Sequence, residues 1–122
     1  MKIRIKGNSV RYRLDKLEVA RFAETAELVE TTQLVGGTFS YILRRSNQVE
    51  TLSAHWQDNS IVFLMPEDIA KQWVETEEVG FQHKLPLENG ESLFLLIEKD
   101  FVCIDNTFED QSNNYPNPNL EC

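Results

Sequence analysis

The sequence has few of the residues that interrupt a chain or cross-link it. Its 122 residues include five glycines, four prolines and two cysteines. Two cysteines are too few for a disulfide framework, and a reducing compartment keeps both as thiols. The remaining composition, 41% hydrophobic and 26% charged, is that of an ordinary globular protein. We therefore expect a single domain with one hydrophobic core.

Long hydrophobic runs are also missing. The apolar run Leu93–Ile97 has the length of a strand, whereas a membrane helix needs about 18 apolar residues. The opening residues Met1–Lys6 are basic and lack the apolar stretch of a signal peptide. We expect a cytoplasmic protein that makes no contact with a membrane.

Positive charge is scarce overall, and its distribution is uneven. The net charge of −8 argues against a general nucleic-acid binder. Residues 1–45 nevertheless hold nine basic residues against five acidic ones, whereas residues 46–122 hold three against fifteen. The basic residues near the start of the chain are therefore the first candidates for a binding surface.

The basic residues near the start alternate with apolar ones, as in a β-hairpin. Gly7-Asn8 fits a two-residue type II′ turn, which sets Ile5 opposite Val10 and Arg4 opposite Arg11. The apolar side chains of both strands then share one face of the hairpin. The opposite face carries five cations: Lys2, Arg4, Lys6, Arg11 and Arg13.

Two short helices are predicted from capping signals and apolar spacing. Asp15 and Glu18 resemble a capping box, which predicts a helix over residues 16–25. Pro66 is predicted to open the second helix at its first position, where a missing N–H costs nothing. A strand over residues 28–35 follows the first helix and is ended by Gly36-Gly37.

Residues 38–65 read as a three-stranded meander with tight turns at Ser46-Asn47 and Asp58-Asn59. In that arrangement the first strand pairs with the second and the second pairs with the third. The alternating apolar residues of all three strands share one face: Phe39, Tyr41, Leu43, Leu52, Ala54, Trp56, Ile61, Phe63 and Met65.

Further strands are expected near residues 79–85, 92–97 and 101–104. The predicted fold class is thus α+β, an antiparallel β-meander or half-barrel of about eight strands with two short helices. Residues 1–105 form this domain. Residues 106–122 are rich in Asn and Pro and are predicted to form an extended C-terminal tail.

Five cations on one hairpin face need neutralising partners, because like charges opposite each other destabilise a sheet. Water and salt, the protein's own carboxylates, or an anionic ligand can each supply them. Arginine binds phosphate through its forked guanidinium group, so a phosphate-bearing ligand is one candidate. Nucleic acid is disfavoured, because no aromatic residues suited to base stacking are interleaved with the cations.

The cysteines and acids of the C-terminal part form a second candidate. Cys103 and Cys122 lack the close paired spacing of a zinc site, and Asp105, Glu109 and Asp110 do not match a calcium loop. We expect a packed Cys103 and a free Cys122, with a metal site or a disulfide as alternatives. His55 and His83 are expected to be structural, and no catalytic motif or cofactor signature is present.

Both ends of the chain resemble a small family of uncharacterised bacterial proteins found mainly in Bacteroidota. The resemblance rests on Met1–Arg11 with Leu14 and Glu18-Val19, and on Glu98–Cys103 with Glu109-Asp110 and Tyr115–Pro118. It extends over nearly the whole chain. The family has no known function, so the resemblance implies a stand-alone bacterial cytoplasmic protein and assigns no site residue.

The sequence favours a non-enzymatic binding or interaction module that contacts anions through its basic hairpin face. The expected partner is a phosphate-bearing small molecule or an acidic protein. The alternative is a small metal-binding protein or enzyme centred on Cys103, Cys122, Asp105 and a histidine. A third possibility is a homodimer built through an exposed strand.

Overall fold

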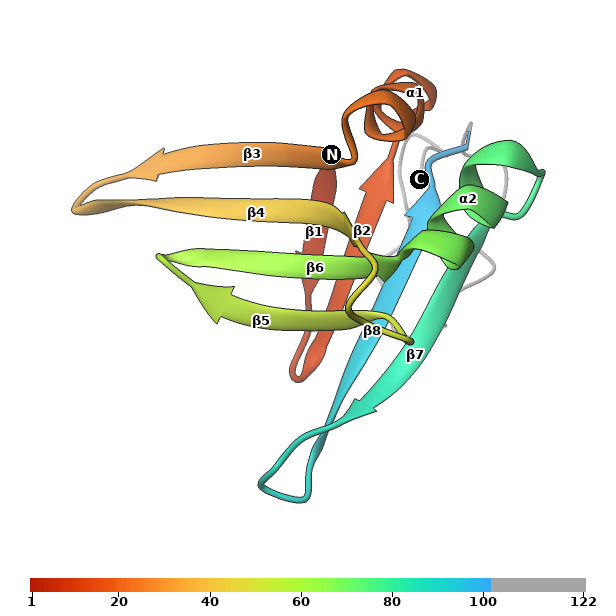
Figure 1. The fold of residues 1–122 in the computed structure, drawn as a ribbon. Coiled ribbons are helices and arrows are strands. Elements are labelled where there is room, and N and C mark those ends of the chain that lie inside the picture. Colours follow the sequence, from red (N-terminus) through yellow and green to blue (C-terminus); the bar gives the residue numbers. More distant parts are fainter. Residues whose placement is uncertain (102–122) are drawn as a thin grey trace, which may run out of the picture.

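The computed structural model describes residues 1–101, which form eight strands and two helices (Figure 1). Sheet 1 has the strand order β1 (Lys2–Ile5), β2 (Ser9–Leu14), β8 (Ser92–Lys99) and β7 (Gly80–Pro86). Sheet 2 has the order β3 (Glu27–Leu34), β4 (Gly37–Ser46), β6 (Ser60–Pro66) and β5 (Ser53–Gln57). The helices are α1 (Lys16–Thr25) and α2 (Glu67–Glu75). The predicted α+β class is confirmed.

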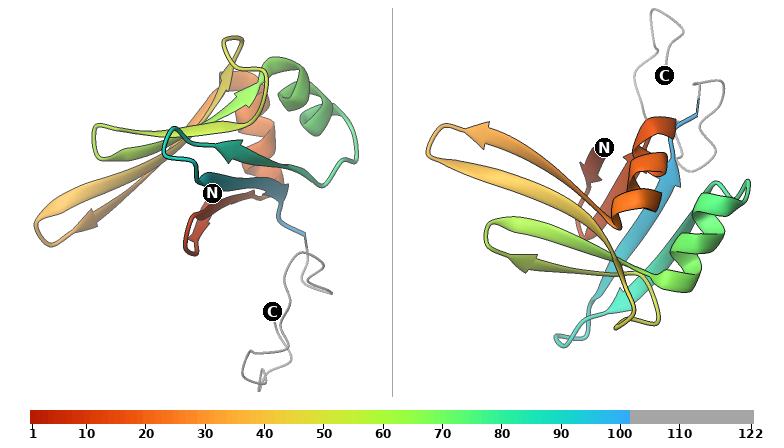
Figure 2. Two further views of the ribbon diagram at one scale, coloured as in Figure 1. Left: turned by 90° about the horizontal axis from the view of Figure 1, so that it is seen from below. Right: turned by 45° about the horizontal axis from the view of Figure 1, so that its top comes forward.

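Each sheet is mixed, with one parallel pair at its centre. β2 pairs in parallel with β8, and β4 pairs in parallel with β6, whereas the other four pairings are antiparallel. The strands of the two sheets cross at a steep angle, and the described strands do not close into a barrel (Figures 1 and 2). The two parallel pairs join segments far apart in the sequence and were not predicted.

The meander predicted for residues 38–65 is wrong in its strand pairing. β4 pairs with β6, and β5 lies on the far side of β6, so that Tyr41 is opposite Ile61. The tight turn predicted at Ser46-Asn47 is also wrong, because β4 continues to Ser46 and residues 47–52 connect it to β5. This longer connection lets β6, with the buried Phe63 and Met65, take the interior position of the sheet.

The other turn and capping signals in the sequence were interpreted correctly. Gly7 adopts a φ of 55°, as a type II′ turn requires, and Asp58 and Asn59 have φ values of 51° and 58° in the turn between β5 and β6. The backbone N–H of Glu18 donates to Asp15 Oδ1 at 2.9 Å, and Asp15 N–H donates to Glu18 Oε1 at 2.9 Å. These contacts complete the predicted capping box of α1.

Helix α2 differs slightly from the prediction. Pro66 is the last residue of β6 and the N-cap of the helix, which begins at Glu67. The apolar stripe points inward as expected, with Ala70 and Trp73 buried. Glu67 and Asp68 lie in the first turn, where negative charge suits the helix dipole.

The core lies between the inner faces of the two sheets and beneath the helices. Tyr12 of β2 packs against Phe63 of β6, with ring centroids 4.8 Å apart. The Tyr12 hydroxyl donates to the Ile61 carbonyl at 3.1 Å and so joins the two sheets, and burial raises the pKa of this hydroxyl. Phe22 of α1 and Trp73 of α2 meet edge to face at 6.2 Å.

The predicted tail, residues 106–122, and the predicted strand beyond Phe101 lie outside the described residues. In the part of the chain that is described, neither helix is long and apolar enough to cross a membrane.

Candidate functional site

The β1–β2 hairpin forms in the predicted register and gathers its cations on one face. Lys2 is opposite Arg13, and Arg4 is opposite Arg11. The alternate residues of β2 enter the core, because Tyr12 is fully buried. We call the outer side of the hairpin the cationic face; its members are Lys2, Arg4, Lys6, Arg11 and Arg13.

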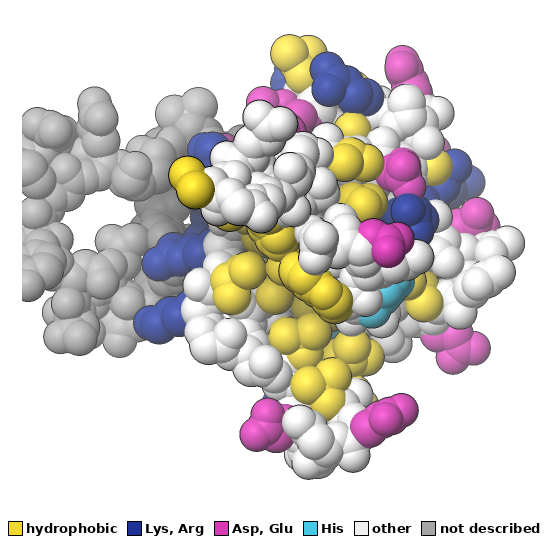
Figure 3. Space-filling model, turned by 90° about the vertical axis from the view of Figure 1, so that its left-hand side faces the viewer, with side chains coloured by type: hydrophobic (Ala, Val, Ile, Leu, Met, Phe, Trp, Pro, Cys, Tyr) yellow, Lys and Arg dark blue, Asp and Glu magenta, His cyan; other side chains and the backbone are white. Residues whose placement is uncertain are grey.

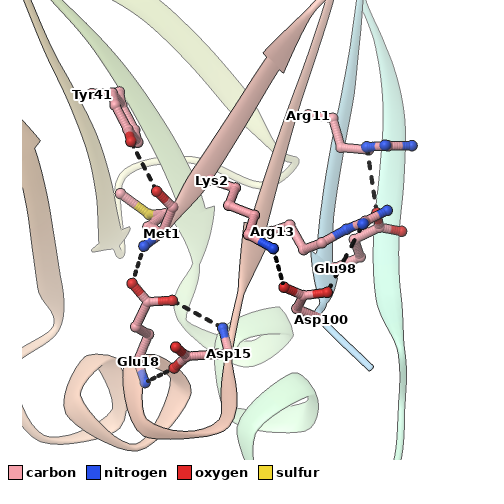
Figure 4. A network of polar contacts seen from close by, with 9 residues as sticks. All are labelled: Met1, Lys2, Arg11, Arg13, Asp15, Glu18, Tyr41, Glu98 and Asp100. Carbon is pink, nitrogen blue, oxygen red and sulfur yellow. Dashed lines mark hydrogen bonds and ion pairs between the residues drawn. The ribbon is translucent and has the colours of Figure 1, made fainter. Parts of the chain in front are cut away.

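A buried carboxylate from β8 lies beside this hairpin. Glu98 is opposite Arg13 in the parallel β2–β8 pair and is only 1% exposed. Its Oε1 accepts from Arg13 Nε at 2.9 Å and from Arg13 Nη2 at 2.7 Å, and it lies 3.4 Å from Arg11 Nε (Figure 4). All three contacts go to the same oxygen, so two guanidinium groups converge on one carboxylate through charge-assisted hydrogen bonds.

Close backbone packing accompanies this carboxylate. Gly80 of β7 is opposite Glu98, and a Cβ added at Gly80 would lie 2.2 Å from the Ile97 carbonyl oxygen and 2.9 Å from the Glu98 Cα. Gly80 does not have a positive φ, so the requirement for glycine is one of space rather than of conformation. The sheet can therefore continue past Glu98 only if this position has no side chain.

A second carboxylate extends the ion-pair network. Asp100 accepts from Lys2 Nζ at 2.8 Å and lies 3.9 Å from Arg13 Nη1 (Figure 4). The backbone N–H of Asp100 donates to the Leu14 carbonyl at 2.8 Å, which fixes its position at the end of β2. Of the neutralising partners that the sequence left open, the protein's own carboxylates serve Lys2, Arg11 and Arg13.

Sequence reasoning missed three residues of this face. Glu98 and Asp100 are more than eighty positions away from the hairpin, and only the parallel β2–β8 pair brings them there. Lys84 of β7 is the third; its partner Phe94 is also opposite Ser9, so Lys84 shares the outer face of sheet 1. The alternation of β7 and β8 could have indicated which side chains share a face, but not which strand lies beside the hairpin.

Neither helix covers the outer face of sheet 1 (Figure 2). The buried residues of α1 and α2 belong to the same core cluster as Leu14 and Ile97, which point to the inner side of the sheet. On the outer side, Leu96 lies between Arg11 and Gln82 and is 6% exposed. The cationic face is therefore the outer surface of a sheet whose other side forms the core.

A second exposed surface is apolar and belongs mainly to sheet 2. Trp56 is 64% exposed and stacks on Phe39, with ring centroids 6.3 Å apart. Both side chains share the face of sheet 2 that carries the core residue Phe63. Hydrophobic side chains form a continuous band on this side of the molecule, with Lys and Arg side chains along one border (Figure 3).

A groove of about 390 Å³ lies between the two helices, away from the hairpin. Phe22, Ala70 and Val74 supply its apolar lining, and Arg45, Lys71 and two glutamates its charged lining. Neither histidine and none of the five hairpin cations contributes to this groove. The residues singled out from the sequence therefore do not converge on it.

The histidines lie on different sheets. His55 of β5 contacts Gln57 Oε1 through Nε2 at 3.1 Å on the exposed face of sheet 2, whereas His83 is half-buried on β7. Within residues 1–101 no group of three His, Cys, Asp or Glu side chains is placed to hold a metal ion. Cys103, Cys122 and Asp105 lie outside the described residues.

The fold and the site define a small α+β domain of two crossed mixed sheets with an ion-paired outer face. The chain belongs to DUF7009, a family of unknown function, whose family model matches residues 1–119. This result confirms the resemblance to an uncharacterised family. No curated protein and no solved structure matches the chain.

Proposed function

We propose that this protein is a non-enzymatic binding module whose cationic face contacts carboxylate groups of an acidic protein partner. One observation carries the proposal: Arg11 and Arg13 already hold the carboxylate of Glu98 on the outer face of sheet 1. The same guanidinium groups bind carboxylates of a partner through the same charge-assisted hydrogen bonds.

The clustering of basic side chains on this face supports the same proposal. The hairpin cations and Lys84 lie on the outer side of sheet 1, and among the described residues Glu98 and Asp100 pair with Lys2, Arg11 and Arg13. Basic side chains gathered in this way attract the carboxylates of a partner over a range of about 10 Å at moderate salt. Because the rest of the chain is acidic, a polyanion as long as a nucleic acid would be repelled beyond the hairpin.

The position of these cations on the outer side of a sheet favours a protein over a small molecule. Small-molecule sites are concave and enclose most of their ligand, whereas these cations lie on the outer surface of a sheet. The groove between the helices contains none of them. A partner that presents several carboxylates at once can contact a surface of this shape.

Titration of the full chain with an octaglutamate peptide, followed by backbone amide chemical shifts, tests the proposal. We expect shift changes on β1, β2 and β8 that weaken as salt is raised. Replacing Arg4 and Arg11 with Gln should weaken peptide binding about tenfold or more, because each charged hydrogen bond contributes about 1.5–3 kcal/mol.

The matched control removes two positive charges elsewhere. Lys16 and Arg21 are exposed on α1, and the K16Q/R21Q variant should bind the peptide almost as well as the wild type. If R4Q/R11Q gains stability and loses no binding, the cations are only a solvated surface and the proposal fails. Inorganic phosphate serves as the second probe; tighter binding of phosphate than of peptide would favour the phosphate-bearing small molecule instead.

The alternative function is a metal centre at Cys103, Cys122 and Asp105. Elemental analysis and thiol titration of the purified protein distinguish it from the binding module. Stoichiometric metal with protected thiols would replace the binding-module proposal by the metal-protein one. We place the protein in the bacterial cytoplasm, on the basis of the family resemblance and of two cysteines that are too few for a disulfide framework.

A further inference from the structure

The exposed edges of the two sheets differ in how well they are protected from pairing with another strand. Within residues 1–101 the edge strands are β1 and β7 of sheet 1 and β3 and β5 of sheet 2. Proteins protect such edges with short strands, charged residues (Lys above all), proline or bulges. β1 has four residues and carries Lys2 and Arg4, β5 has five residues, and β7 contains Lys84 and Pro86.

β3 is the least protected of these edges. It has eight residues, contains no Lys, Arg, Pro or Gly, and pairs one to one with β4 along its whole length without a bulge. Its two charged residues, Glu27 and Glu30, lie in its first half and pair with Arg44 and the N-terminal amine, so the second half carries no charge. Val29 is 52% exposed and Leu34 is 63% exposed. In Figure 1 the half of β3 that leads into β4 lies at the outer edge of sheet 2 with no element beside it.

The hydrogen-bond pattern of β4 shows which groups of β3 point outward. The backbone N–H of Ser40 donates across to Asn59, on the β6 side of β4, at 3.2 Å. Because successive residues of a strand point their backbone groups to opposite sides, Phe39 and Tyr41 bond to β3. Their partners Thr32 and Glu30 therefore face β4.

The outward backbone groups consequently belong to the alternate residues of β3. These are Glu27, Val29, Thr31 and Gln33; the Glu27 carbonyl accepts from Thr25 Oγ1, and the other three each direct one N–H and one C=O away from the sheet. An edge of three successive outward residues is long enough to pair with another strand.

We propose that β3 pairs antiparallel with β3 of a second copy of this chain, centred on Thr32 opposite Thr32. Thr31 and Gln33 of each copy then face each other and form about four backbone hydrogen bonds. The pairing joins the two copies of sheet 2 into one eight-stranded sheet.

The side chains of β3 fit this register. Val29, 52% exposed, comes next to Val35 of the second copy, which is fully exposed at the turn after β3. Thr32 lies opposite Thr32 of the second copy, and threonine pairs are favourable across strands. A slide of four residues in one direction would instead set Glu30 opposite Glu30, and like charges directly opposite destabilise a sheet. The sequence of β3 is thus compatible with its own copy.

Cysteine cross-linking in the full chain tests both the pairing and its register. In a C103S/C122S background, T32C should form a disulfide-linked dimer under mild oxidation, because an opposed pair without mutual hydrogen bonds has its Cα atoms about 4.5 Å apart. The neighbouring T31C faces Gln33 of the second copy and should cross-link far less. Equal cross-linking of T31C and T32C would indicate random collision and overturn the proposal.

Sedimentation velocity of the unmodified full chain gives an independent readout. We expect a dimer that dissociates on dilution, and Q33K should raise its dissociation constant by about tenfold or more, since lysine at an edge opposes strand pairing. Q57K makes the same change on β5 and should leave the dimer intact. A wild type that stays monomeric at millimolar concentration, or a Q33K variant that dimerises like the wild type, would refute the proposal.

Discussion

The two sheets have the same plan but expose opposite kinds of surface. Each has four strands with a parallel pair at its centre. The outer face of sheet 1 carries arginines and a carboxylate, Glu98, that is 1% exposed. Sheet 2 instead exposes Trp56, stacked on Phe39, beyond the part of its inner face that forms the core.

The ion pairs of the two sheets also differ in how exposed they are. The pair between Glu98 and Arg13 in sheet 1 has side chains 2% and 26% exposed. In sheet 2 the pair between Glu27 and Arg44 has both side chains 42% exposed. Burial increases both the cost of losing a partner and the precision with which the remaining group is held. The ion pair of sheet 1 is therefore expected to contribute more to stability than the ion pair of sheet 2.

The largest effect is expected for Glu98→Gln. The substitution keeps the shape but removes the charge that Arg11 and Arg13 face, and we expect a loss of about 2–3 kcal/mol in the free energy of unfolding. The matched change in sheet 2, Glu27→Gln, should cost about 0–1 kcal/mol because that pair is exposed. Urea unfolding of both variants measures the difference. Equal losses would remove the distinction between the two sheets.

A smaller loss is expected for Gly80→Ala in sheet 1. The added Cβ would lie 2.2 Å from the Ile97 carbonyl oxygen, so β7 must move away from β8, at a cost of about 1–3 kcal/mol. Gly37→Ala in sheet 2 is the control, since its Cβ meets nothing within 4 Å and its φ is not positive. The melting temperatures of the two variants, each compared with the wild type, test this prediction. A melting temperature of Gly80→Ala equal to that of the wild type would contradict the close approach at Glu98.

The smallest effect concerns Tyr12, which joins the sheets. Tyr12→Phe removes the hydrogen bond to the Ile61 carbonyl and should cost about 1 kcal/mol at neutral pH. Burial raises the pKa of Tyr12 in the folded protein, whereas the unfolded chain releases this proton near pH 10, the ordinary tyrosine value. Above about pH 10 the folded state thus binds more protons, and stability falls as pH rises.

The Tyr12→Phe variant lacks that alkaline loss, so its deficit relative to the wild type should shrink above about pH 10. Denaturant titrations at neutral and alkaline pH provide the comparison. Tyr41→Phe is a second test of the same linkage: burial and then Glu30 raise the pKa of Tyr41, so its deficit should also shrink at alkaline pH, although its hydroxyl bonds to the Met1 carbonyl and does not join β2 to β6. A constant deficit across this pH range would refute the titration of Tyr12.

Some of the fold and of the candidate site could be predicted from particular residues. Gly7 set the register of the β1–β2 hairpin, and hence the placement of Arg4 opposite Arg11. Asp15 and Glu18 set the start of α1. Each of these features depends on residues only a few positions apart, so conformational preference and side-chain capping were enough to predict them.

Other elements could not be derived in this way. The alternation of residues 38–65 predicted correctly that Tyr41, Ile61 and Trp56 share a face, yet it gave the wrong neighbour to β4. Alternation fixes which side of a strand is buried, but it does not say which strand lies next to it. For the same reason Glu98 and Asp100 could not be predicted as part of the site, because they reach the hairpin only through the pairing of β8 with β2.

The sequence by itself determined the local structure of this protein: its turns, its helix starts, the buried face of most strands and the crowding of five cations on one hairpin. Only the tertiary structure decided the order of strands in each sheet, the carboxylates that pair with Arg11 and Arg13, and the position of β3 at an edge among the described strands. The physical reason is that strand order follows from burying the most apolar strands, β6 and β8, at the centre of their sheets. Strand order therefore depends on all the strands together, and no short stretch of sequence determines it.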